Sequence, residues 1–249
     1  MSDVTISVGE GVTPMHGYLR APASAPKGAV IVAHELFGVN ADIRGVVDHL
    51  AELGYLALAL EHYHRVAPAG ETLARDDAGR ERGFSYLRQL SREDVVEDVR
   101  AAMSDLAARA DVAGRVGMLG FSAGGHMAFL AATRLPLVAT AVRYGGWLTG
   151  GDLPIAKPEP TLEAAAGIAR HRGKLLYIVG GKDALIGPEQ VALIRAKLAE
   201  TQVAHEIVVY PEAAHAFFWE GTASFDRAAR DAAWQRLERF FADAFTPHR

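Results

Sequence analysis

The sequence predicts an α/β fold with a mostly parallel central sheet and helices on both of its faces. Short continuous apolar segments, typical of strands buried on both sides, alternate with longer segments whose apolar residues recur at helical spacing. Strands and helices that alternate in this way form parallel sheets with right-handed crossovers. No repeat or linker divides the 249 residues, so we expect residues 1–249 to form a single domain.

The N-terminal part of the chain predicts an antiparallel edge of this sheet. Residues 4–8 and 15–20 are strand-like and are separated by a turn that contains Gly and Pro. The Ala-Val-Ile-Val-Ala segment at 29–33 then predicts the first buried parallel strand. Residues 42–53 carry Ile, Val and Leu at helical spacing, and residues 55–60 predict a second buried strand.

The remainder of the chain continues the alternation. Further strands are predicted at 115–120, 137–144, 175–180 and 206–210, and further helices at about 93–110, 122–133, 188–200 and 225–245. Two stretches, 62–92 and 147–172, receive no assigned element because glycine, proline and charged residues interrupt them. Both follow predicted strands, and α/β folds build their functional sites beyond the carboxyl ends of strands.

Composition excludes several classes of chemistry. The chain has no cysteine, which excludes disulfides, thiolate metal sites and a cysteine nucleophile. Its net charge of −4 argues against nucleic-acid binding. Because we find neither a targeting segment nor an apolar run of membrane-spanning length, we expect a cytoplasmic protein without a membrane partner.

One motif carries the chemistry. Residues 120–124 read Gly-Phe-Ser-Ala-Gly, which matches the G-x-S-x-G pattern of a nucleophile elbow. The pattern lies between a predicted strand and a predicted helix, as an elbow requires, so that the Ser122 hydroxyl is exposed on a sharp turn. The backbone amide of Ala123 is then expected to donate to a developing oxyanion.

A serine nucleophile needs a general base and a group that orients the base. Asp183 follows the predicted strand at 175–180, and His215 lies in the loop after the next strand. Both therefore lie at the carboxyl ends of strands, as Ser122 does, and the three follow the chain order nucleophile, acid, histidine. We predict that Ser122, Asp183 and His215 form a catalytic triad.

The sequence resembles the dienelactone hydrolase family of α/β-hydrolases from about residue 15 to residue 241. The segments that carry the resemblance are His-Glu-Leu-Phe-Gly-Val-Asn at 34–40, Gly-Phe-Ser-Ala-Gly-Gly at 120–125, Gly-Lys-Asp at 181–183 and Glu-Ala-Ala-His-Ala-Phe at 212–217. The resemblance implies an α/β-hydrolase fold, with the amide of Leu36 as a second oxyanion donor beside Ala123. It also implies that Glu35 lies near the nucleophile, where members of the family use it to regulate a thiol.

The chain departs from the name-giving enzymes of this family in two ways. Their nucleophile is a cysteine, whereas this chain has Ser122. They also carry an arginine shortly after the histidine to bind a substrate carboxylate, whereas residues 216–220 are aromatic and then acidic. Arg80, Arg82 and Arg143 could supply a cation, but solvation at the surface is the favoured interpretation for each of them.

Aromatic residues near the expected site are candidates for the walls of a substrate pocket, an apolar environment that suits a neutral acyl or alcohol group. They are Phe37, Tyr63, Trp147, Phe217 and Trp219. Packing in the core is an equal alternative for each of them.

These observations predict a serine hydrolase that cleaves carboxylic esters of small substrates through an acyl-enzyme, without a metal or organic cofactor. The first alternative is a hydrolase of dienelactone or another butenolide, which would need a cation facing the substrate carboxylate. The second alternative is a noncatalytic binding protein with an α/β-hydrolase fold. The small-molecule ester or lactone is the expected partner, and the chain is expected to act as a monomer or homodimer.

Overall fold

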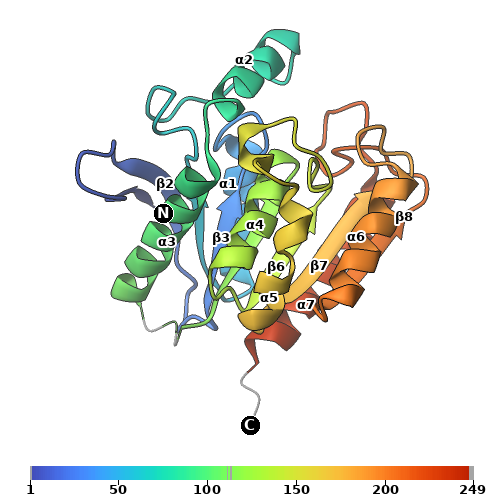
Figure 1. The fold of residues 1–249 in the computed structure, drawn as a ribbon. Helices are drawn as coiled ribbons and strands as arrows, with labels where there is room; N and C mark the ends of the chain where they lie inside the picture. The colour runs from blue at the N-terminus through green and yellow to red at the C-terminus, as the bar shows by residue number, and fades with distance from the viewer. Residues whose placement is uncertain (1, 111, 113, 247–249) are drawn as a thin grey trace.

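The computed structural model describes residues 2–110, 112 and 114–246 and shows one twisted sheet (Figure 1). Among these residues, eight strands lie in the order β1-β2-β4-β3-β5-β6-β7-β8. They are β1 (Ser2–Ile6), β2 (Met15–Arg20), β3 (Ala29–Ala33), β4 (Leu56–Leu60), β5 (Val116–Phe121), β6 (Ala139–Arg143), β7 (Lys174–Gly180) and β8 (Ala204–Tyr210). Strand β2 is antiparallel to both of its neighbours, β1 and β4, and all neighbouring strands from β4 to β8 pair in parallel. The predicted α/β class and its antiparallel N-terminal edge are therefore confirmed.

Helices cover both faces of the sheet, as predicted. They are α1 (Ala41–Glu52), α2 (Asp77–Leu87), α3 (Arg92–Arg109), α4 (Ala123–Arg134), α5 (Ala166–Arg170), α6 (Pro188–Glu200) and α7 (Arg227–Phe245), with 3-10 turns at Pro154–Ala156 and Thr161–Ala164. Helices α3, α4 and α6 lie on one face of the sheet, and α1 and α7 lie on the other (Figure 1). Helix α2 covers neither face and lies beyond the carboxyl ends of the parallel strands (Figure 1).

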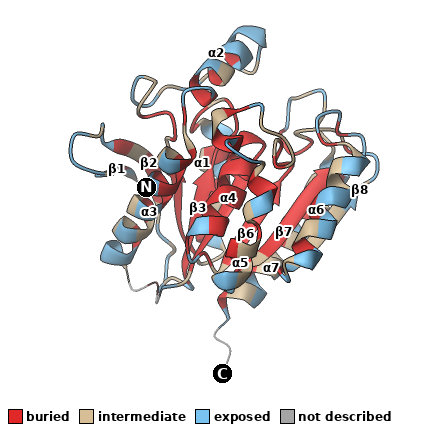
Figure 2. Cartoon of the chain, in the orientation of Figure 1, coloured by how far each residue is buried: buried red, intermediate tan, exposed pale blue. Residues whose placement is uncertain are grey.

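Burial explains why the central strands read as continuous apolar segments. Every residue of β3, β4, β5 and β6 is buried, because helices cover both of their faces (Figure 2). Strand β8 is different, since most of its residues are partly exposed at the edge of the sheet. The central strands thus form a rigid base from which the loops at their carboxyl ends project.

Two differences from the expected elements have physical causes. Strand β1 spans residues 2–6 rather than 4–8, because its register pairs Val4 with Gly17 of β2. Helix α2 lies in a stretch to which the sequence assigned no element. Two of its four buried residues are Gly79 and Gly83, so no apolar periodicity marks it. A β-carbon at Gly83 would lie 2.6 Å from the Leu36 carbonyl oxygen, which shows how closely α2 packs on the segment after β3.

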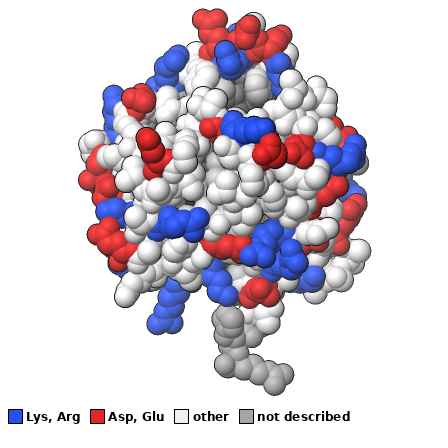
Figure 3. Space-filling view, turned by 90° about the vertical axis from the view of Figure 1, so that its right-hand side faces the viewer, with Lys and Arg blue, Asp and Glu red and all other residues white. Residues whose placement is uncertain are grey.

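The surface has no large area of a single sign on the face shown in Figure 3, where basic and acidic side chains are interspersed. This distribution agrees with the small net charge of the chain. Within the described residues, no helix is both long and apolar enough to cross a membrane.

Candidate active site

Ser122 lies on the sharp turn between β5 and α4, as the elbow motif predicts. Its φ of 51° and ψ of −112° lie in a region that residues other than glycine rarely adopt. Two backbone hydrogen bonds hold this conformation. The Ser122 amide donates to the Arg143 carbonyl at 2.9 Å, and the His126 amide donates to the Ser122 carbonyl at 3.1 Å.

The two glycines of the motif are required by close backbone approach. A β-carbon at Gly120 would lie 2.0 Å from the Gly124 carbonyl oxygen. A β-carbon at Gly124 would lie 2.3 Å from the Ala33 carbonyl oxygen and 2.4 Å from that of His34. Glycine therefore lets the start of α4 pack directly on the end of β3, the neighbouring strand.

The structure brings Ser122, His215 and Asp183 into one chain of hydrogen bonds. The Ser122 Oγ lies 3.0 Å from His215 Nε2, and His215 Nδ1 lies 2.7 Å from Asp183 Oδ2. The other Asp183 oxygen accepts hydrogen bonds from the amides of Leu185 and Ile186 at 2.8 and 3.1 Å. The Asp183 carboxyl is fully buried, whereas the His215 side chain is 20% exposed. A buried, oriented carboxylate thus faces an imidazole that a substrate can reach.

The loops that carry Asp183 and His215 are joined to each other. The Lys182 amide, one residue before Asp183, donates at 2.9 Å to the carbonyl of Ala213, two residues before His215. The ring of Tyr144 packs edge to face with the His215 imidazole, with 5.0 Å between the ring centroids. Backbone bonding and an aromatic contact therefore hold the imidazole in position from two sides.

The two amides predicted to bind an oxyanion lie on adjacent segments. Ala123 is the first residue of α4, and Leu36 is the third residue after β3. Because Gly124 packs against the carbonyls of Ala33 and His34, the start of α4 is adjacent to the segment that leads to Leu36. This packing is what a two-amide oxyanion site requires, and the roles of both amides stay predictions.

Glu35 is buried beside the candidate triad and is held by two donors. One carboxyl oxygen accepts a hydrogen bond from Arg75, and the other accepts one from Trp219 Nε1 at 2.7 Å. Arg75 also pairs with Asp42 at 2.9 Å. Burial raises the pKa of Glu35, and the positive charge of Arg75 is the largest of several effects that oppose this rise, among which His215 also contributes.

Arg75 is a residue of the candidate site that the sequence did not reveal. It lies in the stretch 62–92, where no motif distinguishes it from its charged neighbours. Its only sequence signal was that it lies in a loop region after a strand. The guanidinium stacks over the rings of Phe37 and Trp219, with its central carbon 5.1 and 5.0 Å from the two ring centroids. Arg75 therefore joins Glu35 to two of the predicted pocket aromatics.

A cavity of about 170 Å³ lies beside His215. Its lining consists of Gly146, Trp147, Thr149, Gly150, Asp152, Leu185, Gln190 and His215. Trp147 is the one predicted pocket aromatic among these residues. The cavity is thus bounded by the loop after β6 on one side and by the segment that leads into α6 on the other.

The other predicted pocket aromatics have different surroundings. Phe217 is fully buried and contacts the rings of Tyr144 and Tyr210, so it packs in the core. Tyr63 is also buried, with its ring against His34. Trp219 is 3% exposed and donates to Glu35. None of these three lines the cavity beside His215, and the contacts described here are those of packing and positioning. Phe37 is partly exposed under Arg75.

The alternative cations considered from the sequence do not approach the cavity. Arg143 is fully buried and stacks over Phe218 at 4.3 Å, and burial lowers its pKa to about 10. Arg82 pairs with Glu71 at 3.0 Å, and Arg80 is an exposed residue of α2. None of the three lines the cavity beside His215.

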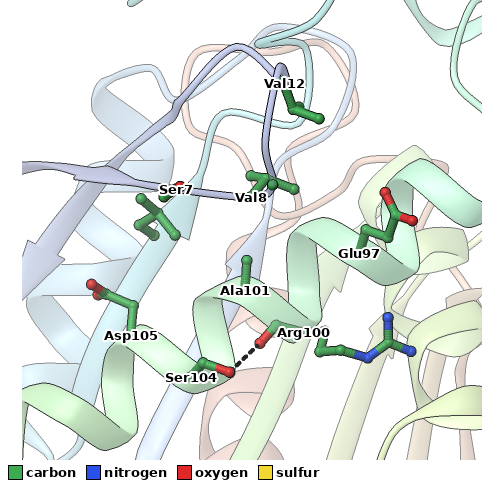
Figure 4. A pocket seen from close by; sticks show the side chains of 10 residues that line it. Ser7, Val8, Val12, Glu97, Arg100, Ala101, Ser104 and Asp105 are labelled. Atoms are coloured by element: carbon green, nitrogen blue, oxygen red, sulfur yellow. Dashed lines mark hydrogen bonds between the residues drawn. The ribbon is translucent and has the colours of Figure 1, made fainter.

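A larger cavity of about 800 Å³ lies between the segment after β1 and helix α3 (Figure 4). Ser104 on its wall donates to the Arg100 carbonyl at 3.1 Å. No residue of the candidate triad lines it. The cavity beside His215 is therefore the candidate substrate site.

In the part of the chain that the structure describes, no group of three or more His, Asp or Glu side chains is arranged to hold a metal ion.

The strand order, the crossovers and the strained serine after β5 define an α/β-hydrolase fold. The comparison with protein families narrows this class. Residues 15–245 match the dienelactone hydrolase family, and the chain belongs to this family of hydrolases.

Relatives and solved structures agree with this assignment. A protein of Synechocystis sp. that is provisionally named a carboxymethylenebutenolidase is 32% identical over 227 residues, which cover 90% of each chain. A protein of Escherichia coli K12 with the same provisional name is 31% identical and covers 88% of this chain and 78% of its own. The crystal structure of a provisionally named dienelactone hydrolase from Klebsiella pneumoniae superposes with a TM-score of 0.83, at 30% identity and with 97% and 98% of the two chains covered.

Proposed function

We propose that this protein is a serine hydrolase that cleaves small carboxylic esters through an acyl-enzyme intermediate. The observation that carries the proposal is the continuous chain of hydrogen bonds from Ser122 through His215 to Asp183. The three residues come from three separate loops, and the strained backbone at Ser122 presents the hydroxyl to the imidazole. A nucleophile, a base and an orienting acid in this order supply what acyl transfer requires.

In the first half of the reaction, Ser122 Oγ attacks the ester carbonyl carbon while His215 Nε2 takes the hydroxyl proton. Asp183 accepts a hydrogen bond from His215 Nδ1 and stabilises the imidazolium that forms. The amides of Ala123 and Leu36 donate to the oxyanion of the tetrahedral intermediate. His215 then protonates the oxygen of the leaving alcohol, and the acyl group remains on Ser122.

In the second half, His215 takes a proton from the water that attacks the acyl carbon. The tetrahedral intermediate then breaks its bond to Ser122 Oγ, which takes the proton back from His215, and the carboxylic acid is released. The imidazole must be neutral at the start of both halves.

Covalent labelling tests the proposed mechanism. The wild type is expected to react with a fluorophosphonate probe at Ser122 and to gain the mass of one phosphonyl group. Ser122→Ala should remain unlabelled, because Ser122 is the one hydroxyl among the described residues that is hydrogen-bonded to His215. Ser104→Ala, on the exposed face of α3, is a matched control and should label like the wild type. A wild type that stays unlabelled would overturn the proposal.

Lactone hydrolysis is the second candidate function, because the relatives named above carry a name for the opening of a butenolide. An anionic lactone needs a cation near the triad, and Arg75 is the cation closest to fulfilling this role. However, Glu35 and Asp42 already balance its charge. Turnover of an anionic butenolide together with failure to hydrolyse any neutral ester would favour this candidate.

A further inference from the structure

The cavity beside His215 differs from the rest of the site in its charge. Asp152 supplies a carboxylate to its wall, and the side chains of Thr149 and Gln190 supply neutral polar groups. No lysine or arginine is among the residues that line it. Within the described chain, Asp152 has no ion-pair partner, so its charge is available to a group that enters the cavity.

The cavity lies where the leaving group of an ester must be. This inference rests on the proposed function, in which His215 Nε2 protonates the oxygen of the departing alcohol. That oxygen must therefore come within hydrogen-bonding distance of His215, and the rest of the alcohol extends into the space that adjoins the imidazole. At about 30 Å³ for each water-sized group, the cavity of about 170 Å³ holds an alcohol of roughly six non-hydrogen atoms.

Neighbouring charges do not cancel that of Asp152. The N-terminus of α6 adds a partial positive charge near Gln190, but Glu189 in its first turn opposes that charge. Lys182 is paired with Glu212. Arg88 stacks on Phe84, whose ring in turn contacts Trp147, and it does not line the cavity. The charges at the cavity are therefore negative: Asp152 lies on its wall and Asp183 lies behind His215, and no lysine or arginine lines the cavity to offset them.

We propose that Asp152 is a specificity-determining residue, which selects esters whose alcohol portion is cationic or neutral and disfavours those whose alcohol portion is anionic. The acidic wall is the opposite of what an anionic lactone or a carboxylate-bearing alcohol requires. The polar groups of Thr149 and Gln190 add hydrogen-bonding partners for hydroxyl or amine substituents on the alcohol.

Three acetate esters of similar size test this proposal. They are acetylcholine, its uncharged carbon isostere dimethylbutyl acetate, and the anionic acetate ester of isethionate. The measurement is kcat/KM from acetate release, expressed as the ratio of cationic to anionic ester. Asp152→Asn is expected to lower this ratio about fivefold, since an exposed charge interacts modestly with each substrate charge. Gln190→Glu should raise the ratio by a similar factor.

Asp243→Asn, on the exposed side of α7, is the matched control for loss of one negative charge and should leave the ratio unchanged. An unchanged ratio in both cavity variants, with the neutral ester still hydrolysed, would overturn the role of Asp152 and leave the proposed function standing. A wild type that hydrolyses none of the three esters and resists the fluorophosphonate would overturn both. Because Gln190→Glu acts in the opposite direction, a destabilised Asp152→Asn protein does not end the test.

The position of the charge in the substrate provides a second test. The ethyl ester of betaine carries its cation on the acyl side, whereas acetylcholine carries it on the alcohol side. Asp152→Asn should reduce kcat/KM for acetylcholine more than for the betaine ester. An equal or larger effect on the betaine ester would contradict the assignment of the cavity to the leaving group.

Discussion

At the scale of single residues, Ser122 shows how the fold accommodates strain at the point where a hydroxyl is needed. A residue other than glycine in this backbone region costs about 1–3 kcal/mol. Glycine would remove the strain and with it the nucleophile. The backbone bonds to Arg143 and His126, together with the tight packing of Gly124, hold the strained turn in place.

Glu35 provides the first prediction at this scale. Both of its carboxyl oxygens accept hydrogen bonds, from Arg75 and Trp219, in a buried environment. In Glu35→Gln, the NH2 group of the new amide would face one of these donors and could not accept its hydrogen bond. Arg75 would also lose its buried counter-charge. We expect the free energy of unfolding to fall by about 1–3 kcal/mol, which urea unfolding measures. Such a loss would assign to Glu35 the role of holding the segment after β3.

The matched control for this variant is Glu81→Gln. Glu81 is an exposed residue of α2, so neutralising it should leave stability within about 0.5 kcal/mol of the wild type. Equal stability of Glu35→Gln and Glu81→Gln would show that the buried contacts of Glu35 do not support the fold.

A site residue could be predicted from the sequence where a short stretch of neighbouring residues identifies it. Ser122 was predicted from a five-residue motif, and Asp183 and His215 from their positions after strands. The partners of Glu35 lie 40 and 184 residues away in sequence, at Arg75 and Trp219. No local pattern encodes such a contact, so the sequence alone left the surroundings of Glu35 undetermined.

At the scale of secondary structure, the same reasoning separates the buried strands from α2. The central strands were predicted because burial on both faces requires continuous apolar residues. Helix α2 was not, because Gly79 and Gly83 make up half of its buried residues, and the buried side chains of Tyr86 and Leu87 at its end do not form a stripe along it. Close backbone packing thus replaces the hydrophobic stripe from which a helix is ordinarily predicted.

The junction of α4 and β3 yields a prediction at this scale. In Gly124→Ala, the new methyl group would meet the carbonyl oxygens of Ala33 and His34, which belong to backbone and have little freedom to move. We expect a loss of about 1–3 kcal/mol in unfolding free energy. The clash would move Ala123 away from the segment of Leu36, and thus separate the two predicted oxyanion donors. We therefore expect a large fall in kcat for a neutral ester and a smaller change in KM.

Gly45→Ala supplies the control for added methyl groups. Gly45 is an exposed residue of α1, and nothing lies within 4 Å of a β-carbon built there. Alanine in a helix interior is favoured over glycine by up to about 1 kcal/mol. This variant should therefore keep full activity and gain stability, and a Gly124→Ala protein that behaves like it would refute the packing argument.

At the scale of the whole molecule, the fold buries titratable groups around its site. Burial lowers the pKa of both His34 and His126 to about 4. The unfolded chain binds protons at these residues near pH 6.5, so it takes up more protons than the folded chain between pH 6.5 and 4. The stability from these neutral histidines is full above that range and is lost as the pH falls through it.

The size of this loss can be tested at one position. Between pH 7 and pH 5, His126 is expected to remove roughly 2 kcal/mol from the free energy of unfolding. In His126→Gln, the amide can still donate to the Gly146 carbonyl and accept from Thr161, which are the partners of the imidazole. Urea unfolding of this variant at pH 7, 6 and 5 should show a pH dependence that is weaker by about this amount.

Thr161→Val distinguishes the protonation of His126 from the loss of its contacts. It removes the hydrogen bond that Thr161 donates to His126 but leaves the imidazole able to take up a proton. We expect this protein to be less stable than the wild type throughout the range and to keep most of its pH dependence. Because carboxylates also titrate near pH 4, the comparison is confined to pH 5 and above. A His126→Gln protein whose stability falls with pH as steeply as that of Thr161→Val would show that the buried imidazole is not the group responsible.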